Sequence, residues 1–204
     1  MIDLSRPETI GLMLVDLQND FLHPDGAYAR GKATSASIGE LPGRLKPVVD
    51  AVRAAGGWIV STHFTLVPGR RGEPLISLHL AALRPFLRKG DFCPGGWGHA
   101  LVDALQPADL SVDKVAFSAF YMSRLEWVLR KAGIETLVFS GIVTNGGVAS
   151  TLRDAHVRDF TTVLLEDGCA AFSDETHRIN VAALRSVADV MTCADFIAAL
   201  QVPQ

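Results

Sequence analysis

Cysteine is scarce in this sequence and gives no sign of a cross-linked or metal-bound framework. Cys93, Cys169 and Cys193 are odd in number and widely spaced, and no CxxC pair occurs. Such spacing fits neither a disulfide scaffold nor a zinc or redox motif. We therefore expect three reduced thiols and a cytoplasmic protein.

Clustered positive charge and long apolar runs are also missing. The formal net charge is −3, whereas binding to nucleic acid requires clustered Lys and Arg. No run of about 18 apolar residues occurs. The N-terminal "MIDLSRPETIGLMLVD" has no basic region before its short apolar run, unlike a secretion signal. We expect a small-molecule partner, no nucleic acid and no membrane.

The chain does contain short apolar runs that alternate with longer segments of helical period. With 49% apolar and 20% charged residues over 204 positions, it is long enough for one sizeable core, so we expect a single domain over residues 1–204. The predicted strands are 9–16, 58–64, 111–115, 136–141, 161–167 and 189–193, and the predicted helices are 41–57, 123–133, 146–159 and 174–187. This alternation predicts an α/β fold, with a doubly wound, six-stranded parallel sheet and helices on both faces.

Three strand ends carry residues of chemical interest, because ligands of such sheets bind at the carboxyl ends of the strands. Asp16 follows the first strand in "LVDLQNDF", Lys114 lies in "VDKVAFSAF", and "GIVTNGG" follows the strand at 136–141. Each signal is weak alone. An Asp after a strand often caps a turn, a Lys at a strand end is usually solvated, and a Gly pair usually serves a turn.

Taken together, these segments resemble the isochorismatase-like hydrolase superfamily. The resemblance runs from "LMLVDLQNDFL" through "KVAFSAF" and "SGIVTNGGVASTLRDA" to "LEDGCAAFS". It implies a doubly wound α/β fold, a homo-oligomer, and a site built from an Asp, a Lys and, in the amidase branches, a Cys. The Asp corresponds to Asp16 and the Lys to Lys114, but the Cys position holds Gly147.

Glycine at that position decides the predicted chemistry, because it cannot act as a nucleophile. The isochorismatase branch also lacks the thiol: an acid protonates an enol ether on carbon, and water adds to the oxocarbenium ion. We therefore favour enol-ether hydrolysis, with Asp16 as general acid and Lys114 orienting it. Hydrolysis of a C–N bond in a small amide or ureide, and ligand binding without catalysis, are the alternatives.

The turn itself resembles that of the amidases more than that of the isochorismatases. The resemblance implies a cis peptide bond between Val143 and Thr144 and backbone N–H groups that stabilise an oxyanion. The residues predicted to form this turn are Val143, Thr144, Asn145, Gly146 and Gly147.

A Pro- and Gly-rich stretch, residues 67–99, is predicted to be a loop over the site. In it, Arg70 and Arg71 either bind a substrate carboxylate or are simply solvated. Aromatic residues that either wall a pocket or belong to the core are Phe21, Trp97, Phe117 and Phe120. We predict no cofactor and no catalytic metal, because His63 has no Asp or second His nearby in sequence, and His79 and His99 are scattered.

Overall fold

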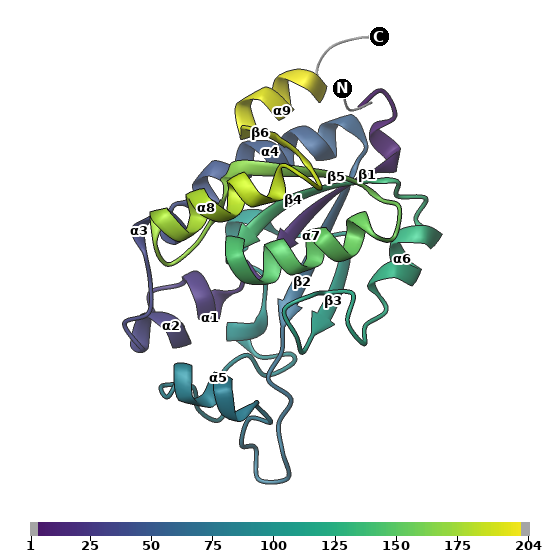
Figure 1. Ribbon diagram of the computed structural model, residues 1–204. Coiled ribbons are helices and arrows are strands. Elements are labelled where there is room, and N and C mark those ends of the chain that lie inside the picture. The colour runs from purple at the N-terminus through teal and green to yellow at the C-terminus, as the bar shows by residue number, and fades with distance from the viewer. Residues whose placement is uncertain (1–3, 201–204) are drawn as a thin grey trace.

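A six-stranded parallel sheet forms the centre of the computed structural model, which describes residues 4–200 (Figure 1). The strand order is β3-β2-β1-β4-β5-β6, and every neighbouring pair is parallel. The strands are β1 (Ile10–Val15), β2 (Trp58–Phe64), β3 (Leu110–Lys114), β4 (Thr136–Ile142), β5 (Thr161–Ala170) and β6 (Asp189–Met191). The predicted doubly wound α/β sheet is confirmed, and each strand lies within three residues of its predicted ends.

Helices cover both faces of this sheet and bury one apolar core on each side (Figure 1). On one face, α4 (Leu41–Ala55) and α9 (Cys193–Leu200) pack on alternate side chains of β1 such as Leu12 and Leu14. On the other face, α6 (Leu125–Lys131), α7 (Ala149–His156) and α8 (Asp174–Leu184) pack on Met13 and Val15. Successive side chains of a strand point to opposite faces, so β1 contributes to both cores.

Several short helices were not predicted from the sequence. The stretch 67–99, expected to be a loop, contains α5 (Leu78–Leu83) and the 3-10 turn η2 (Trp97–His99). The others are α1 (Asn19–Leu22), α2 (Ala27–Arg30), α3 (Ala36–Gly39) and η3 (Asp103–Leu105). Elements this short carry too few residues for a periodic apolar pattern. Within residues 4–200, no helix combines the length and the apolar character needed to cross a membrane.

The strand order reverses direction between β1 and β4, which lie side by side at the centre of the sheet. Connections on either side of such a point leave in opposite directions, and a crevice opens at the carboxyl ends of the two strands. Asp16 follows β1 at this point, and the turn η4 (Thr144–Val148) follows β4 one residue after its end. The topology thus brings together two of the three strand ends singled out in the sequence.

Gly141, beside the crevice, is required by close backbone contact between β4 and β1. Its φ is +112°, and a Cβ there would lie 2.2 Å from the carbonyl oxygen of Val15. We expect Gly141→Ala to lower the free energy of unfolding by at least about 2 kcal/mol, measured by urea unfolding. Gly43→Ala is the control: it lies in α4 with no atom within 4 Å of a new Cβ, and should stabilise by up to about 1 kcal/mol. Equal stability of the two variants would contradict this account.

Candidate active site

Asp16 lies in a buried and conformationally unusual position. It follows β1 with φ of +56°, in the left-handed region that few residues other than glycine adopt. Its N–H donates to the carbonyl oxygen of Thr62 at 3.0 Å, and only 5% of the residue is exposed. Non-glycine residues held in this conformation concentrate at functional sites, where the surrounding structure enforces them.

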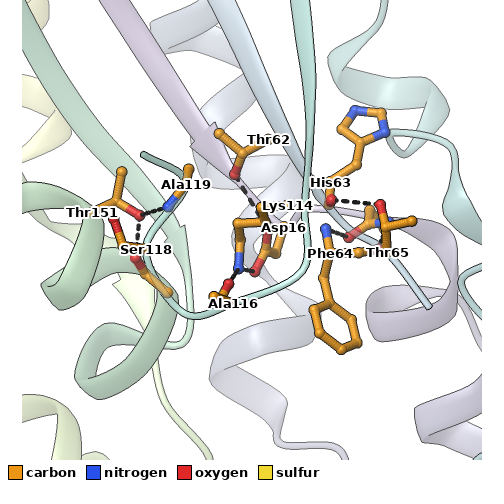
Figure 2. Close-up of polar contacts among 12 residues, drawn as sticks. Asp16, Thr62, His63, Phe64, Thr65, Lys114, Ala116, Ser118, Ala119 and Thr151 are labelled. Carbon is orange, nitrogen blue, oxygen red and sulfur yellow. Dashed lines mark hydrogen bonds and ion pairs between the residues drawn. The ribbon is translucent and has the colours of Figure 1, made fainter. Parts of the chain in front are cut away.

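Lys114 reaches Asp16 across the end of the intervening strand β2. Its Nζ lies 2.7 Å from Asp16 Oδ2 and also donates to the carbonyl oxygen of Ala116 at 3.0 Å (Figure 2). Thr62, on β2 between them, donates its hydroxyl to Asp16 Oδ1 at 3.2 Å. Because neighbouring strands are about 4.8 Å apart, a long side chain is needed to span from β3 to the end of β1.

Burial controls the ionisation of this pair. Desolvation raises the pKa of Asp16 above its usual range, and the Lys114 ammonium and the Thr62 hydroxyl oppose that rise. The carboxyl group is therefore held between two opposing influences: the low dielectric favours the protonated form, and the cation favours the carboxylate. A carboxyl group in this environment is suited to exchange a proton during a reaction.

The turn after β4 places Gly147 directly against Asp16. A Cβ at Gly147 would lie 3.1 Å from Asp16 Oδ2 and 2.9 Å from the carbonyl oxygen of Ile142. The cis peptide bond that precedes this turn, a bond between two non-proline residues, joins Ile142 and Val143. The predicted position, between Val143 and Thr144, is therefore wrong by one residue, because the turn begins directly at the end of β4.

Thr151, one turn into α7, fixes this turn from behind. Its hydroxyl donates to the carbonyl oxygen of Gly147 at 2.7 Å and accepts from the N–H of Ala119 at 3.1 Å. The bond to Ala119 joins the segment after Lys114 to α7 (Figure 2), and the bond to Gly147 joins α7 to the turn. Thr151 is fully buried, and sequence reasoning did not single it out, since a Thr in a helix has no distinctive signature.

Asp16, Lys114 and Gly147 line one pocket with a volume of about 380 Å³. Its walls are mainly apolar, and α5 closes one side with Leu80 and Leu83. A pocket of this size and character suits a small organic molecule. The aromatic lining residues are Phe21, Tyr28, Phe64, Phe117 and Phe172.

Arg84 is the one arginine among the residues described as lining this pocket. Its guanidinium carbon lies 5.3 Å from the ring centre of Phe172 and 5.7 Å from that of Tyr28. Its Nε also donates to the Tyr28 hydroxyl at 3.3 Å. Its Nη1 donates to the carbonyl oxygen of Leu83 at 3.0 Å. Stacking of this kind holds a guanidinium flat, and the Nη2 N–H groups have no partner among the described residues.

Only some of the residues predicted to bind substrate line this pocket. Phe21 and Phe117 line the pocket, whereas Arg70, Arg71 and Trp97 are exposed residues outside its described lining. Phe120 is a core residue that packs against Phe160.

Within the turn, Thr144 and Asn145 are not among the residues described as lining the pocket. The Thr144 hydroxyl bonds His177 Nδ1 at 2.8 Å, and Asn145 is exposed. Val143 and Gly147 line the pocket, and a Cβ at Gly146 would meet the side chains of Val143 and Phe117. The turn therefore presents mainly backbone and a glycine to the pocket.

Residues that sequence reasoning missed are Arg84, Tyr28, Phe64 and Phe172. Arg84 and Phe172 lie far apart in the chain, and neither belongs to a motif. Their meeting depends on how the 67–99 stretch folds over the sheet, which no local pattern encodes.

None of the three cysteines is placed to act as a nucleophile in this pocket. None lines the pocket among the described residues. Burial raises the pKa of Cys193 to about 12 and that of Cys169 further. Both therefore remain thiols near neutral pH, and a thiol is a poor nucleophile.

A second, larger groove lies between α3 and α8, with a volume of about 840 Å³. Its lining is largely polar and charged, and includes Arg44, Glu166 and His177. It contains neither Asp16 nor Lys114. The smaller pocket is the candidate active site, because it holds the buried ion pair and the turn.

One group in residues 4–200 has the composition and proximity to hold a metal ion: His63, His99 and Asp113. The sequence argument against a metal treated His63 as isolated from other histidines. In the structure, the ring centres of His63 and His99 are 5.0 Å apart, although the two residues lie far apart in the sequence. Chain folding, rather than local spacing, brings the two rings together.

Comparison with known proteins identifies relatives along almost the whole chain. Residues 11–195 match the family model described as "Isochorismatase domain". The ureidoacrylate amidohydrolase RutB of Methylobacterium radiotolerans is 34% identical, with 97% of this chain and 81% of that protein aligned. The protein of the same name from Caulobacter vibrioides is 32% identical, with 79% and 76% aligned.

Solved structures share the fold. A cysteine hydrolase from Pseudomonas syringae pv. phaseolicola has a TM-score of 0.81 and 24% identity, with 96% of this chain and 93% of that chain covered. An N-carbamoylsarcosine amidase from Thermoplasma acidophilum has a TM-score of 0.70 and 24% identity, with 91% and 96% covered. At these identities the likeness establishes the fold alone.

Removal of the cation from the buried pair should destabilise the protein in a pH-dependent way. We expect Lys114→Met to lower the free energy of unfolding at pH 7 by about 3 kcal/mol, because an unpaired carboxylate remains buried. The pKa of Asp16 in the folded state would then lie further above its unfolded value, so the loss is small in acid and grows as pH rises. Denaturant unfolding across pH measures this.

The double variant Asp16→Asn/Lys114→Met supplies the control, since it removes both charges. It should recover much of the lost stability and show a flatter pH dependence. A double variant as unstable at pH 7 as Lys114→Met would show that packing, rather than the unpaired charge, sets the cost.

Proposed function

Because this chain belongs to the isochorismatase family of hydrolases, we propose that it hydrolyses a C–N bond of a small amide or ureide, using water in place of a cysteine thiol. The amidohydrolase names of the relatives support this reaction class. Enol-ether hydrolysis, which the sequence analysis favoured, has no such support among these relatives. The alternative reading thus becomes the main one.

The observation that carries the proposal is the position of Gly147 against Asp16. The carboxylate oxygen Oδ2 faces the point where a side chain at residue 147 would begin, 3.1 Å away. Asp16 and Lys114 are therefore arranged around a position that glycine leaves accessible to water and substrate. Acid–base groups need this placement, within hydrogen-bond reach of the atom that gains or loses a proton.

The reaction proceeds by addition and elimination. Asp16, as carboxylate, accepts a proton from water while the water oxygen bonds to the carbonyl carbon. The resulting oxyanion is stabilised by the amino-terminal end of the η4–α7 helix, where backbone dipoles favour negative charge. Asp16 then returns the proton to the leaving nitrogen, the C–N bond breaks, and an acid and an amine are released. Lys114 holds the Asp16 carboxylate in position throughout.

Arg84 gives the pocket a preference for acidic substrates. The acrylate group in the relatives' name carries a carboxylate, and a guanidinium binds a carboxylate through two parallel hydrogen bonds. Arg84 stands at the pocket wall in that role, for which the sequence analysis had considered Arg70 and Arg71, with solvated side chains as the alternative. A small carboxylated amide or ureide is the substrate class that this combination favours.

Enol-ether hydrolysis is kept as a second candidate on one observation. That reaction needs Asp16 as a protonated acid, and burial raises the pKa of Asp16. A carboxyl group whose protonated form is favoured by burial can protonate carbon. The two candidates require opposite protonation states of one residue, which makes them separable by experiment.

We also propose a single-domain, homo-oligomeric protein of the cytoplasm. The family match over residues 11–195 supports one domain, and the free cysteines are consistent with a reducing compartment. Exposed apolar side chains after β3, including Phe117, Tyr121 and Met122, support burial against another copy.

Turnover should depend on Asp16 and not on any thiol. On a panel of small amides, ureides and enol ethers, we expect activity on an amide or ureide. Asp16→Asn should lower kcat by about 10²–10⁴-fold, the usual contribution of a general acid or base. Replacement of all three cysteines by Ala is the control and should leave kcat within a few-fold. Turnover of no compound in the panel would favour a non-catalytic binding protein, and a covalent adduct on a cysteine would overturn the water mechanism.

The pH profile of kcat/KM distinguishes the two reaction classes. For amide hydrolysis, Asp16 must be ionised, so the rate should rise as pH increases through a pKa above the 3.8 usual for aspartate. For enol-ether hydrolysis, Asp16 must be protonated, so the rate should fall over the same range. Steady-state assays of the best substrate measure the profile. A rate independent of pH there would exclude Asp16 from both roles.

Arg84 should select substrates by their carboxylate. We expect Arg84→Gln to raise KM for a carboxylated amide about 10–100-fold, because a charge-assisted hydrogen bond is lost. KM for a neutral amide of the same shape should change little. Arg71→Gln is the matched control, and a larger effect there than at Arg84 would assign the anion contact to Arg71 instead.

A further inference from the structure

The turn that presents Gly147 to the pocket begins without a side-chain cap. The helical stretch starts at Thr144 and runs through η4 into α7, and the side chain of the preceding residue, Val143, makes no capping hydrogen bond. A capping side chain would occupy the first N–H groups of the helix and fix its start at the same time. A helix end that keeps these groups for an oxyanion has no such cap, so its start needs another restraint.

A hydrogen bond from α8 supplies that restraint. His177 Nδ1 lies 2.8 Å from the hydroxyl oxygen of Thr144, the first residue of η4. Thr144 is fully buried. At the other end of the turn, the Thr151 hydroxyl holds the carbonyl oxygen of Gly147 at 2.7 Å. The turn is therefore fixed at both ends, and neither His177 nor Thr151 belongs to the described lining of the pocket.

The helix that carries this imidazole is itself well anchored. Helix α8 lies beside α7 on the same face of the sheet (Figure 1), and its Val181 and Leu184 are buried in the core there. His177 is in the first turn of α8, which Ser173 caps by accepting from the N–H of Thr176 at 3.2 Å. The position of the ring thus depends on the core and not on the pocket.

The ring is neutral near pH 7 and keeps one donor and one acceptor nitrogen. Burial lowers the pKa of His177 below its usual 6.5, Arg44 adds to this effect, and Asp174 and Glu166 oppose it. A neutral imidazole can accept from a hydroxyl or donate to it, so the bond to Thr144 forms in either tautomer. The ring also borders the larger groove, where a substituted side chain finds space.

We propose that His177 is a positioning residue for hydrolysis: through Thr144, it holds the amino-terminal end of the η4–α7 helix where the oxyanion forms. This role rests on the proposed function, in which that helix end stabilises the oxyanion. Thr144 and His177 lie outside the described lining of the pocket, whereas Arg84, which binds the substrate carboxylate, lies within it. Loss of the Thr144–His177 bond should therefore lower the rate and leave substrate binding unchanged.

Paired substitutions test this hydrogen bond. Thr144→Val keeps the shape of the side chain and removes the hydroxyl, and His177→Phe keeps a ring and removes its nitrogens. At about pH 8, each should lower kcat about 10–100-fold with KM within about threefold, since small displacements of catalytic groups have effects of this size. Thr144→Ser retains a hydroxyl and should recover most of kcat. The double variant Thr144→Val/His177→Phe should be no slower than the slower single variant, because the same bond is lost in all three.

Leu184→Val is the control for a general loss of stability. It removes one buried methylene two turns further along α8 and leaves the Thr144–His177 bond in place. It should lower the melting temperature but keep kcat within about twofold. An unchanged kcat in Thr144→Val would overturn the proposal. So would a loss of kcat in Leu184→Val as large as that in Thr144→Val, because stability alone would then explain both.

Amide hydrogen exchange separates this role from the proposed function. Amides of residues 144–148 should exchange faster in Thr144→Val and His177→Phe than in Thr144→Ser and the unaltered protein, because the turn opens more readily without the bond. If the unaltered protein turns over no substrate, the proposed function fails, and faster exchange in these variants still supports the restraint. Equal exchange in Thr144→Val and Thr144→Ser would overturn positioning by His177, whatever the activity.

Discussion

The buried ion pair between Asp16 and Lys114 is the constraint on which the site depends. Removing two charges from water is costly, and good geometry must repay that cost. The geometry comes from strand register: Val15 pairs with Thr62, and Phe64 pairs with Lys114. With this register the Lys114 ammonium lies 2.7 Å from a carboxylate that belongs to a strand two positions away. A slip of one residue in β3 would turn Lys114 to the other face and leave Asp16 buried alone.

Two glycines, Gly141 in β4 and Gly147 in the turn after it, lie next to the Asp16–Lys114 ion pair and have different roles. Gly141 lets β4 approach the backbone of Val15, where no Cβ fits. Gly147 leaves open the space in front of Asp16, although a Cβ there would crowd the Ile142 carbonyl oxygen at 2.9 Å. The first glycine serves the sheet and the second shapes the pocket. A side chain restored at residue 147 therefore has to displace backbone as well as contact Asp16, so the present turn is adapted to glycine.

The sequence was sufficient to predict the sheet, because apolar runs of strand length alternate with helical periods along the chain. It also located Asp16 and Lys114, because residues after parallel strands meet at one edge. It could not predict contacts that depend on the 67–99 stretch. Arg84 rather than Arg70 or Arg71 lines the pocket, and His99 meets His63, because short helices and turns fold that stretch over the sheet. The cis bond was misplaced by one residue, since a strand end is defined by hydrogen bonds that sequence does not mark.

Under the proposed water mechanism, the groups around Gly147 must supply what a thiol would otherwise provide. In a cysteine enzyme the nucleophile is part of the chain and is already positioned, whereas water must be bound and oriented in each turnover. A site that uses water therefore relies more on the placement of its acid–base group and on the substrate's own anchoring. In this pocket Asp16 is fixed by Lys114 and Thr62, and Arg84 is held against the rings of Tyr28 and Phe172. A substrate held by its carboxylate at Arg84 would present its carbonyl at a defined distance from Asp16, which is the positioning that the proposed water mechanism requires.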